Sequence, residues 1–233
     1  MKRLILAFAA ALTATPAAAM EEGHTPVFHY ASLETDYADW GEADRELTFD
    51  GEGWIGTDEH KLWAKAEGEW ADGNWHEAEA QLLYGKPVSD FWDLQAGIRH
   101  DIEPRSTSYA AFGVHGLAPY FFETDVTGFV SHRGDASLRA KASIDLLLTQ
   151  RLIMEPYAET NIFFSDVEEQ DVGSGISDID TGIQLRYEIT RKLAPYIDFN
   201  YASKLGNTRD IAKMNGEDAE SFVVRAGIRL WFN

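Results

Sequence analysis

Apolar residues recur at every second position along most of this chain, and this alternation restricts its fold more than any other feature. The closing segment, VVRAGIRLWFN at residues 223–233, shows it clearly. In an extended chain, one face of this segment carries Val224, Ala226, Ile228, Leu230 and Phe232. The other face carries Val223, Arg225, Gly227, Arg229 and Trp231. A period of two over about ten residues predicts a long strand whose two faces meet different surroundings.

The same alternation returns in many segments, with charged residues between the apolar ones. The further segments are residues 28–37, 47–55, 62–70, 78–84, 92–98, 108–117, 122–130, 138–146, 158–162, 179–187 and 197–201. With the closing segment they give about twelve strands, an even number. A soluble barrel would turn its apolar rows inward, which would leave the charged rows outside. Tilted strands of about ten residues match the apolar band of an outer membrane, and a closed barrel pairs every backbone donor and acceptor in lipid. The sequence therefore predicts an all-β fold, a transmembrane antiparallel up-and-down β-barrel of about 12 strands.

The connections between these strands are short at one end of the predicted barrel and longer at the other. Long polar connections are expected near residues 39–44, 101–107, 165–177 and 206–219. Short ones are expected near residues 57–59, 86–89, 117–119, 149–151 and 190–193, and two connections on the long side, 72–74 and 133–135, are short as well. This difference is typical of an outer-membrane barrel with short periplasmic turns and longer loops outside the cell.

Aromatic and charged residues occupy the positions that such a barrel needs. Aromatic residues near the ends of the apolar rows predict girdles at the two membrane surfaces: Tyr37, Trp70, Tyr84, Trp92, Tyr120, Tyr187, Tyr201 and Phe232. At this strand number the lumen is expected to be narrower than a porin channel and largely filled by long charged side chains. The side chains expected there are Glu67, Glu69, Arg139, Lys141, Asp145, Glu155, Glu159, Arg186, Arg225 and Arg229.

The start of the chain has the pattern of a secretory signal peptide. Two basic residues follow Met1, an apolar run extends to Leu12, and three alanines end at Ala19. We therefore expect a signal peptide at residues 1–19, a short periplasmic segment at 20–26 and the barrel at 27–233. The predicted location is the outer membrane.

Charge and cysteine content narrow the possible partners. The formal net charge is -19, so the protein repels nucleic acid and attracts cations. Acidity for solubility alone is the other explanation of this charge. The chain has no cysteine, so any metal site must use imidazole, thioether or carboxylate ligands.

Several longer blocks of the sequence resemble the copper resistance protein B family. They are HGLAPYFFETD at 115–125, DLLLTQRLI at 145–153, GSGISD at 173–178, LRYEITRKLAPYI at 185–197 and VRAGIRLWF at 224–232. The resemblance covers most of the chain from about Ser32 onward. It implies an outer-membrane barrel that contributes to copper resistance by binding or passing copper ions, together with periplasmic copper-resistance proteins and outer-membrane lipid.

Two features depart from that family pattern. Family members often carry a Met- and His-rich segment before the barrel, whereas the segment here, MEEGHTPVFHY, offers only Met20, His24 and His29. The chain also places Asn233 after the terminal aromatic Phe232. Because of the first departure, copper ligands are expected in the barrel itself and not in an N-terminal tail.

Inside the barrel, the candidate metal ligands are His115, Glu123 and Asp93. Strand phase directs His115 into the lumen near the periplasmic end, and it directs the two carboxylates inward at a similar depth. Imidazole flanked by carboxylates suits Cu(II) better than Cu(I), and zinc would also be accepted. The alternative is that His115 only hydrogen-bonds an acid or a carbonyl of a polar lumen.

Other constellations give weaker functional hypotheses. The segment MNGEDAESF could gather a cation through Met214 and the acidic residues after it, although a solvated loop explains it as well. Ser131, His132 and Asp135 are the nearest approach to a hydrolytic triad, but adjacent residues of a strand point to opposite faces. No enzyme is predicted. The alternatives to a copper function are a narrow general cation-permeable pore and, third, an outer-membrane hydrolase.

Overall fold

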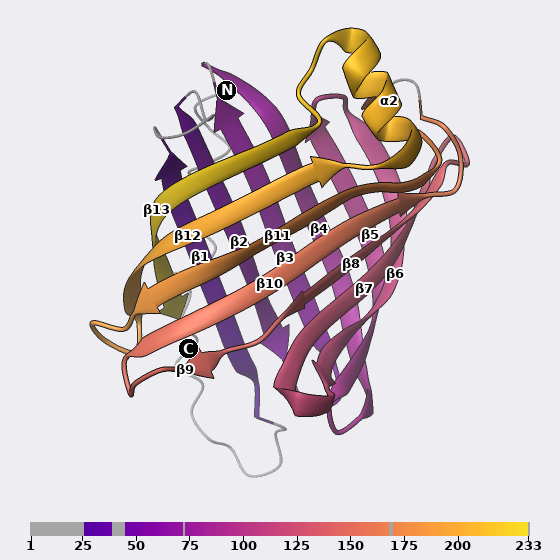
Figure 1. Cartoon of the computed structure of the whole chain (residues 1–233). Coiled ribbons are helices and arrows are strands. Elements are labelled where there is room, and N and C mark those ends of the chain that lie inside the picture. The colour runs from indigo at the N-terminus through magenta and orange to yellow at the C-terminus, as the bar shows by residue number, and fades with distance from the viewer. Residues whose placement is uncertain (1–25, 39–44, 72, 168–169, 233) are drawn as a thin grey trace.

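The chain forms a closed antiparallel β-barrel (Figure 1). The computed structural model describes residues 26–38, 45–71, 73–167 and 170–232. The expected signal peptide, Met20, His24 and Asn233 lie outside these residues. Closure is made where β13 (Glu220–Phe232) pairs with β1 (Phe28–Ala38).

The described residues contain thirteen strand segments, and these occupy twelve positions around the barrel. The reason is that β8 and β9 both pair with β10 on the same side. The prediction of an up-and-down barrel of about 12 strands is therefore confirmed. The other strands are β2 (Glu46–Gly56), β3 (Lys61–Ala71), β4 (Asn74–Ser89), β5 (Trp92–Glu103), β6 (Thr107–Ala118), β7 (Phe122–Ser131), β8 (Ala136–Ser143), β9 (Leu146–Leu147), β10 (Leu152–Phe163), β11 (Gly175–Tyr187) and β12 (Leu193–Lys204).

The break between β8 and β9 corrects the prediction of one continuous strand through residues 138–146. The ladder stops at Ser143 and resumes at Leu146, in an unchanged register with β10. Pro156 of β10 lies opposite the break, where its carbonyl accepts the Ile144 N–H at 3.2 Å. Proline has no N–H to return that bond, so the ladder is interrupted there.

A second correction concerns the turn expected at residues 86–89. These residues belong to β4, which continues to Ser89 and pairs with β5 as far as Trp92. The chain reverses at residues 90–91 instead. Polar Lys86 and the following Pro87 indicated a turn, but the ladder with Leu94 and Asp93 outweighs that local signal.

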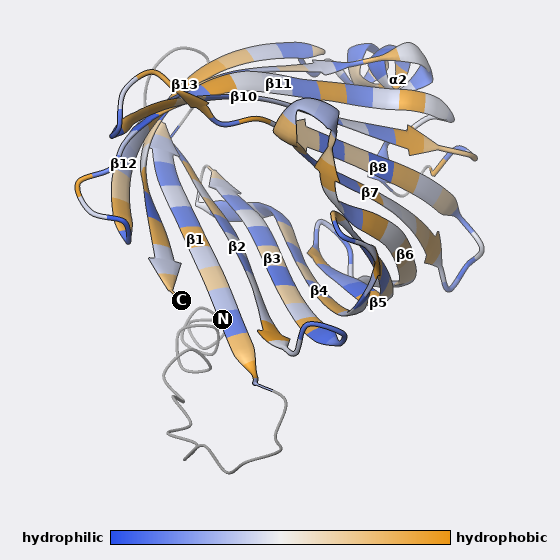
Figure 2. Cartoon of the chain, turned by 90° about the horizontal axis from the view of Figure 1, so that it is seen from below, coloured by the Kyte–Doolittle hydropathy of each residue, from blue (hydrophilic) through white to orange (hydrophobic). Residues whose placement is uncertain are grey.

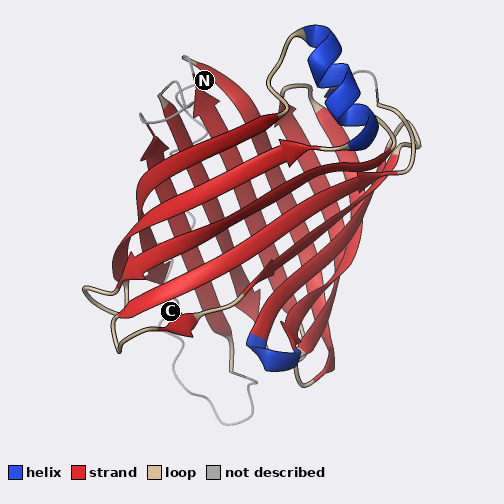
Figure 3. Ribbon diagram, viewed as in Figure 1, coloured by secondary structure: helices blue, strands red, loops and turns tan. Residues whose placement is uncertain are grey.

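The end of the barrel opposite the short turns carries a helix that was not predicted from the sequence. Residues 206–219 were expected to form a polar connection, yet α2 (Gly206–Asn215) occupies most of it (Figure 3). Gly216 ends the helix in the left-handed conformation, with φ of 79°, which glycine adopts without strain. Thr208 anchors the helix to the β10–β11 connection by accepting the Gly173 N–H at 3.1 Å.

The outer surface of the barrel is apolar, and the hydropathy alternates along the strands (Figure 2). Large apolar side chains such as Leu82, Ile98 and Ile183 lie exposed on it. Of the expected girdle residues, Tyr37, Tyr84, Tyr187, Tyr201 and Phe232 are exposed, and Tyr120 lies in the 3-10 turn η1 (Pro119–Phe121) at the short-turn end. No helix among the described residues is long and apolar enough to cross a membrane.

Glycines on the inner face let aromatic rings lie flat against the barrel wall. The Tyr157 ring covers Gly182, where an added Cβ would stand 2.5 Å from the tyrosine hydroxyl and 2.6 Å from the Phe199 carbonyl oxygen. The Tyr157 hydroxyl in turn donates to Asp198 at 2.9 Å. Gly182 is therefore required by the close approach of a neighbouring ring.

Replacing Gly182 by alanine is expected to lower the free energy of unfolding by about 1–3 kcal/mol, because the Tyr157 ring must leave its place. Chemical unfolding of the refolded barrel in detergent or lipid measures this effect. Gly128→Ala is the matched control, since an added Cβ there would meet nothing closer than 3.6 Å. Equal stability of the two variants would show that the ring does not depend on the missing Cβ.

Candidate functional site

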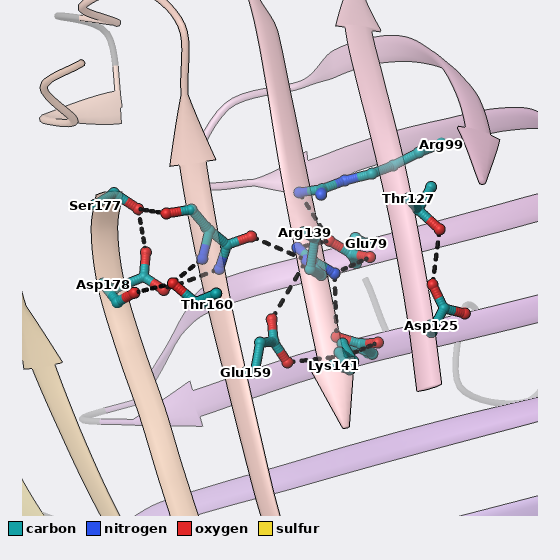
Figure 4. Close-up of polar contacts among 12 residues, drawn as sticks. Glu79, Arg99, Asp125, Thr127, Arg139, Lys141, Glu159, Thr160, Ser177 and Asp178 are labelled. Carbon is teal, nitrogen blue, oxygen red and sulfur yellow. Dashed lines mark hydrogen bonds and ion pairs between the residues drawn. The ribbon is translucent and has the colours of Figure 1, made fainter. Parts of the chain in front are cut away.

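The lumen is crossed by a network of ion pairs centred on Arg139 of β8. Its guanidinium donates to both carboxylate oxygens of Glu79 at 3.0 Å each, from the far side of the barrel. It also lies 3.3 Å from Glu159, and Glu79 accepts a second contact from Arg99 at 2.8 Å. Lys141 adds a contact of 2.7 Å to Glu67. Figure 4 shows Arg139 together with Glu79, Glu159 and Lys141. Strands on opposite walls are thus joined by charge-assisted contacts.

A second network joins the strands around the barrel closure. Arg229 of β13 contacts Glu34 of β1 and, at 2.9 Å, Glu155 of β10. Glu155 also pairs with Arg186. Arg225, four residues earlier on β13, contacts Glu46 at 2.6 Å.

The expected lumen charges are therefore found where strand phase predicted them. Nine of them form ion pairs across or along the lumen: Glu67, Arg139, Lys141, Asp145, Glu155, Glu159, Arg186, Arg225 and Arg229. Glu69, the tenth, lies opposite Thr48 of β2 and Glu77 of β4.

The inner face holds an apolar cluster that was not predicted from the sequence. Trp63, Leu83, Ala111 and Phe129 are buried together there. Two guanidinium groups lie near the Phe129 ring, with Arg99 4.8 Å and Arg139 5.6 Å from its centre. Strand phase could have shown this, because Phe129 alternates in step with Asp125 and Thr127. One wall of the lumen is thus apolar and carries cations over its rings.

His115 lies inside the barrel, near the end of β6 that leads into the short turn. Its ring packs on Trp63, with 5.0 Å between the ring centres. Its Nδ1 points at Asp125 of β7, 3.5 Å from the carboxylate oxygen Oδ2. That separation is too long for a hydrogen bond, and Nδ1 has no hydrogen-bond partner among the described residues.

The two carboxylates expected around His115 take different places. Asp93 lies directly opposite His115 in the β5–β6 ladder, but its carboxylate holds the Lys61 ammonium at 2.6 Å. Glu123 lies one step nearer the turn, opposite Leu117, and interacts electrostatically with His115. Copper ligation by these residues stays a prediction.

Asp125, the carboxylate nearest to His115, was missing from the expected set. Its neighbours explain its fixed position, because it accepts from Lys65 at 2.5 Å and from Thr127 at 2.7 Å. The short connection after residue 118 sets the register that places His115 opposite Asp125. Counting outward from the LAPY turn could have found this pair.

Three other histidines have neighbours outside this group. His29 pairs with Ile55 in the ladder, His60 contacts the Tyr84 hydroxyl, and His100 contacts Ser108 at 2.9 Å. Over the described ranges, no three His, Asp or Glu side chains are arranged to hold a metal ion. A metal site in this lumen would therefore need a ligand other than His, Asp or Glu, or small movements of these side chains.

The residues of the suspected triad form a turn. The Ser131 hydroxyl donates to the Asp135 carboxylate at 3.1 Å and accepts the Arg133 and Asp135 backbone N–H groups at 3.1 Å each. The hydroxyl is thereby used to cap the β7–β8 connection. Met214 lies exposed on α2, in a segment that was expected to be a loop.

An apolar exterior around a charged lumen, closed by twelve antiparallel strand positions, defines an outer-membrane β-barrel. The fold resembles solved porins. NanC porin is 12% identical, with a TM-score of 0.57 over 86% of this chain and 98% of that chain. KdgM porin is 10% identical, with a TM-score of 0.52 over 88% of this chain and 99% of that chain.

The chain belongs to the copper resistance protein B family. Residues 28–232 match the family model described as copper resistance protein B precursor. Copper resistance protein B of Escherichia coli is 43% identical over 212 residues, which cover 90% of this chain and 71% of that protein. A homolog in Pseudomonas syringae pv. tomato is 38% identical over 200 residues, covering 84% and 68%. The resemblance noted in the sequence is thus confirmed, and the protein is an outer-membrane protein with a role in copper resistance.

Proposed function

We propose that this barrel supports copper tolerance by binding copper ions in its lumen or passing them across the outer membrane, together with periplasmic copper-resistance proteins. The observation that carries the proposal is the imidazole of His115 held among inward-facing carboxylates at the short-turn end of the lumen. Nitrogen and oxygen ligands of this kind suit Cu(II). The family of the chain supplies the link to copper.

The proposed copper site uses His115 with Glu123 or Asp93 as ligands. Glu123 is the better placed of the two carboxylates, because Asp93 is engaged by Lys61 at 2.6 Å. A metal bound by Asp93 must displace that ammonium group. The resulting ligand exchange would let an ion bind and leave again, which passage through a pore requires.

Deleting the gene is expected to sensitise the bacterium to copper far more than to zinc. Growth on graded concentrations of the two metals measures this, with the wild-type gene on a plasmid as the positive control. Ser131→Ala in the restored gene should complement fully, since Ser131 caps a turn. Equal sensitivity to copper and zinc would contradict a copper-specific role.

A general cation-permeable pore is the second candidate, and a row of carboxylates favours it. Glu34, Asp50, Glu67 and Glu79 lie opposite one another on the neighbouring strands β1 to β4. Acidic rings select cations over anions without preference for copper. Conductance of the purified barrel in planar bilayers separates the two functions, because a general pore carries potassium freely.

A further inference from the structure

Six inward-facing positions form a compact block beside the Trp63 ring. One row across three strands is Asp93, His115 and Asp125, and the next row is Gln95, Gly113 and Thr127. Gly113 has no side chain, and the Thr127 hydroxyl lies where one would begin, 2.5 Å from the position of an added Cβ. Residues diagonal across such a ladder lie within reach of one another's side chains.

The gap between His115 and Asp125 has the size of a metal site. Two protein ligands bonded to one ion at about 2.0–2.2 Å stand about 2.8–3.6 Å apart. The distance between His115 Nδ1 and Asp125 Oδ2 is 3.5 Å. The Nδ1 atom is buried, and no hydrogen bond from the described residues occupies it.

The positively charged ammonium group of Lys65 lies at the same carboxylate oxygen. Its Nζ lies 2.5 Å from Asp125 Oδ2, above the Trp63 ring at 5.9 Å from the ring centre. The ammonium group therefore marks a position that already stabilises positive charge. A metal ion bound to Oδ2 would have to take its place.

Gln95 offers a further ligand that is otherwise unexplained. The residue is only 1% exposed, yet neither its amide oxygen nor its amide nitrogen has a partner in the part of the chain that the structure describes. Burying an amide without partners is unfavourable. An ion ligated by the amide oxygen would satisfy that oxygen.

We infer that a divalent copper ion binds between His115 Nδ1 and Asp125 Oδ2, with the Gln95 amide oxygen as third ligand, in exchange for the Lys65 ammonium. The inference rests on the proposed copper function and changes its ligands from Glu123 and Asp93 to Asp125 and Gln95. One imidazole and two oxygen donors form a set that Cu(II) accepts. Lys65 is the counterion that keeps Asp125 neutralised when no metal is bound.

Titration of the purified barrel with Cu(II), by calorimetry and by electron paramagnetic resonance, tests the site. Asp125→Asn and Gln95→Leu are each expected to weaken binding at least about tenfold. Lys65→Met is expected to tighten it about tenfold, because the competing charge-assisted contact is removed. Lys204→Met, which removes an exposed lysine paired with Glu217 outside this block, is the control and should bind as wild type does. Heat-modifiable mobility on a gel verifies that each variant is folded.

The possible results of these titrations distinguish the ligand set of the site from the proposed copper function. Unchanged binding in Asp125→Asn and Lys65→Met, with loss in His115→Ala and Glu123→Gln, would overturn the new ligand set and leave the proposed function standing. A wild-type barrel that binds no Cu(II) would also overturn the site, while the growth experiment decides the function independently. Weaker binding in Asp125→Asn together with tighter binding in Lys65→Met would support the exchange.

Discussion

Replacing Arg139 by alanine is expected to lower the free energy of unfolding by about 3–5 kcal/mol, because the change removes the cation shared by three carboxylates that face the lumen, Glu67, Glu79 and Glu159. The Arg139 side chain is 13% exposed, and Glu79, its bidentate partner, is 11% exposed. Unfolding of the refolded barrel in urea measures the loss. The variant also removes one of the two guanidinium groups that cover Phe129.

Lys204→Ala is the matched control for Arg139. Its ion pair with Glu217 has a similar length, 2.7 Å, but the two side chains are 40% and 49% exposed. An exposed pair contributes about 0–1 kcal/mol, so this variant should be nearly as stable as wild type. Equal losses in the two variants would mean that the lumen screens charge as well as bulk water does.

An arginine placed at Ile183 on the outer face is expected to destabilise the membrane-inserted barrel by about 2–4 kcal/mol. Ile183 is 45% exposed, and it lies near the middle of β11, where lipid chains surround the strand. Folding into lipid vesicles across a range of denaturant concentrations measures the change. The cost arises because a guanidinium group at this depth loses its hydration.

Ile176→Arg provides the control on the same strand. Ile176 is similarly exposed, at 51%, but lies one residue from the start of β11 at the membrane rim. Arginine near the interface costs about 0–1 kcal/mol. A loss at Ile176 as large as that at Ile183 would contradict the placement of the apolar band.

The ion pairs also bear on how a cation could cross this barrel. Arg139 and Lys141 lie over Glu67, Glu79 and Glu159, so these carboxylates are already neutralised by the protein. A passing cation must therefore compete with a side-chain cation or use carboxylates such as Asp50, which lies between Glu34 and Glu67. Competition of this kind slows passage and makes it selective.

Strand identity and the direction of each side chain could be predicted from the sequence. Along β13, the phase of Arg225 and Arg229 follows from simple alternation, because successive side chains of a strand point to opposite faces. The helix α2 could not be read in the same way. Its ten residues are mostly polar and are stabilised in part by contacts with the distant β10–β11 connection, such as Thr208 with Gly173.

The amino-acid sequence by itself determined the barrel, its strand number, its family and the inward phase of His115, since each depends on local alternation or on matched blocks of residues. Only the tertiary structure decided which charges meet. Arg225 contacts Glu46, which is 179 residues away, and no local pattern relates them. The same holds for the pairing of Lys65 with Asp125 from β3 and β7. Such contacts depend on strand register and on the curvature that brings opposite walls together, and both are fixed only when the barrel closes.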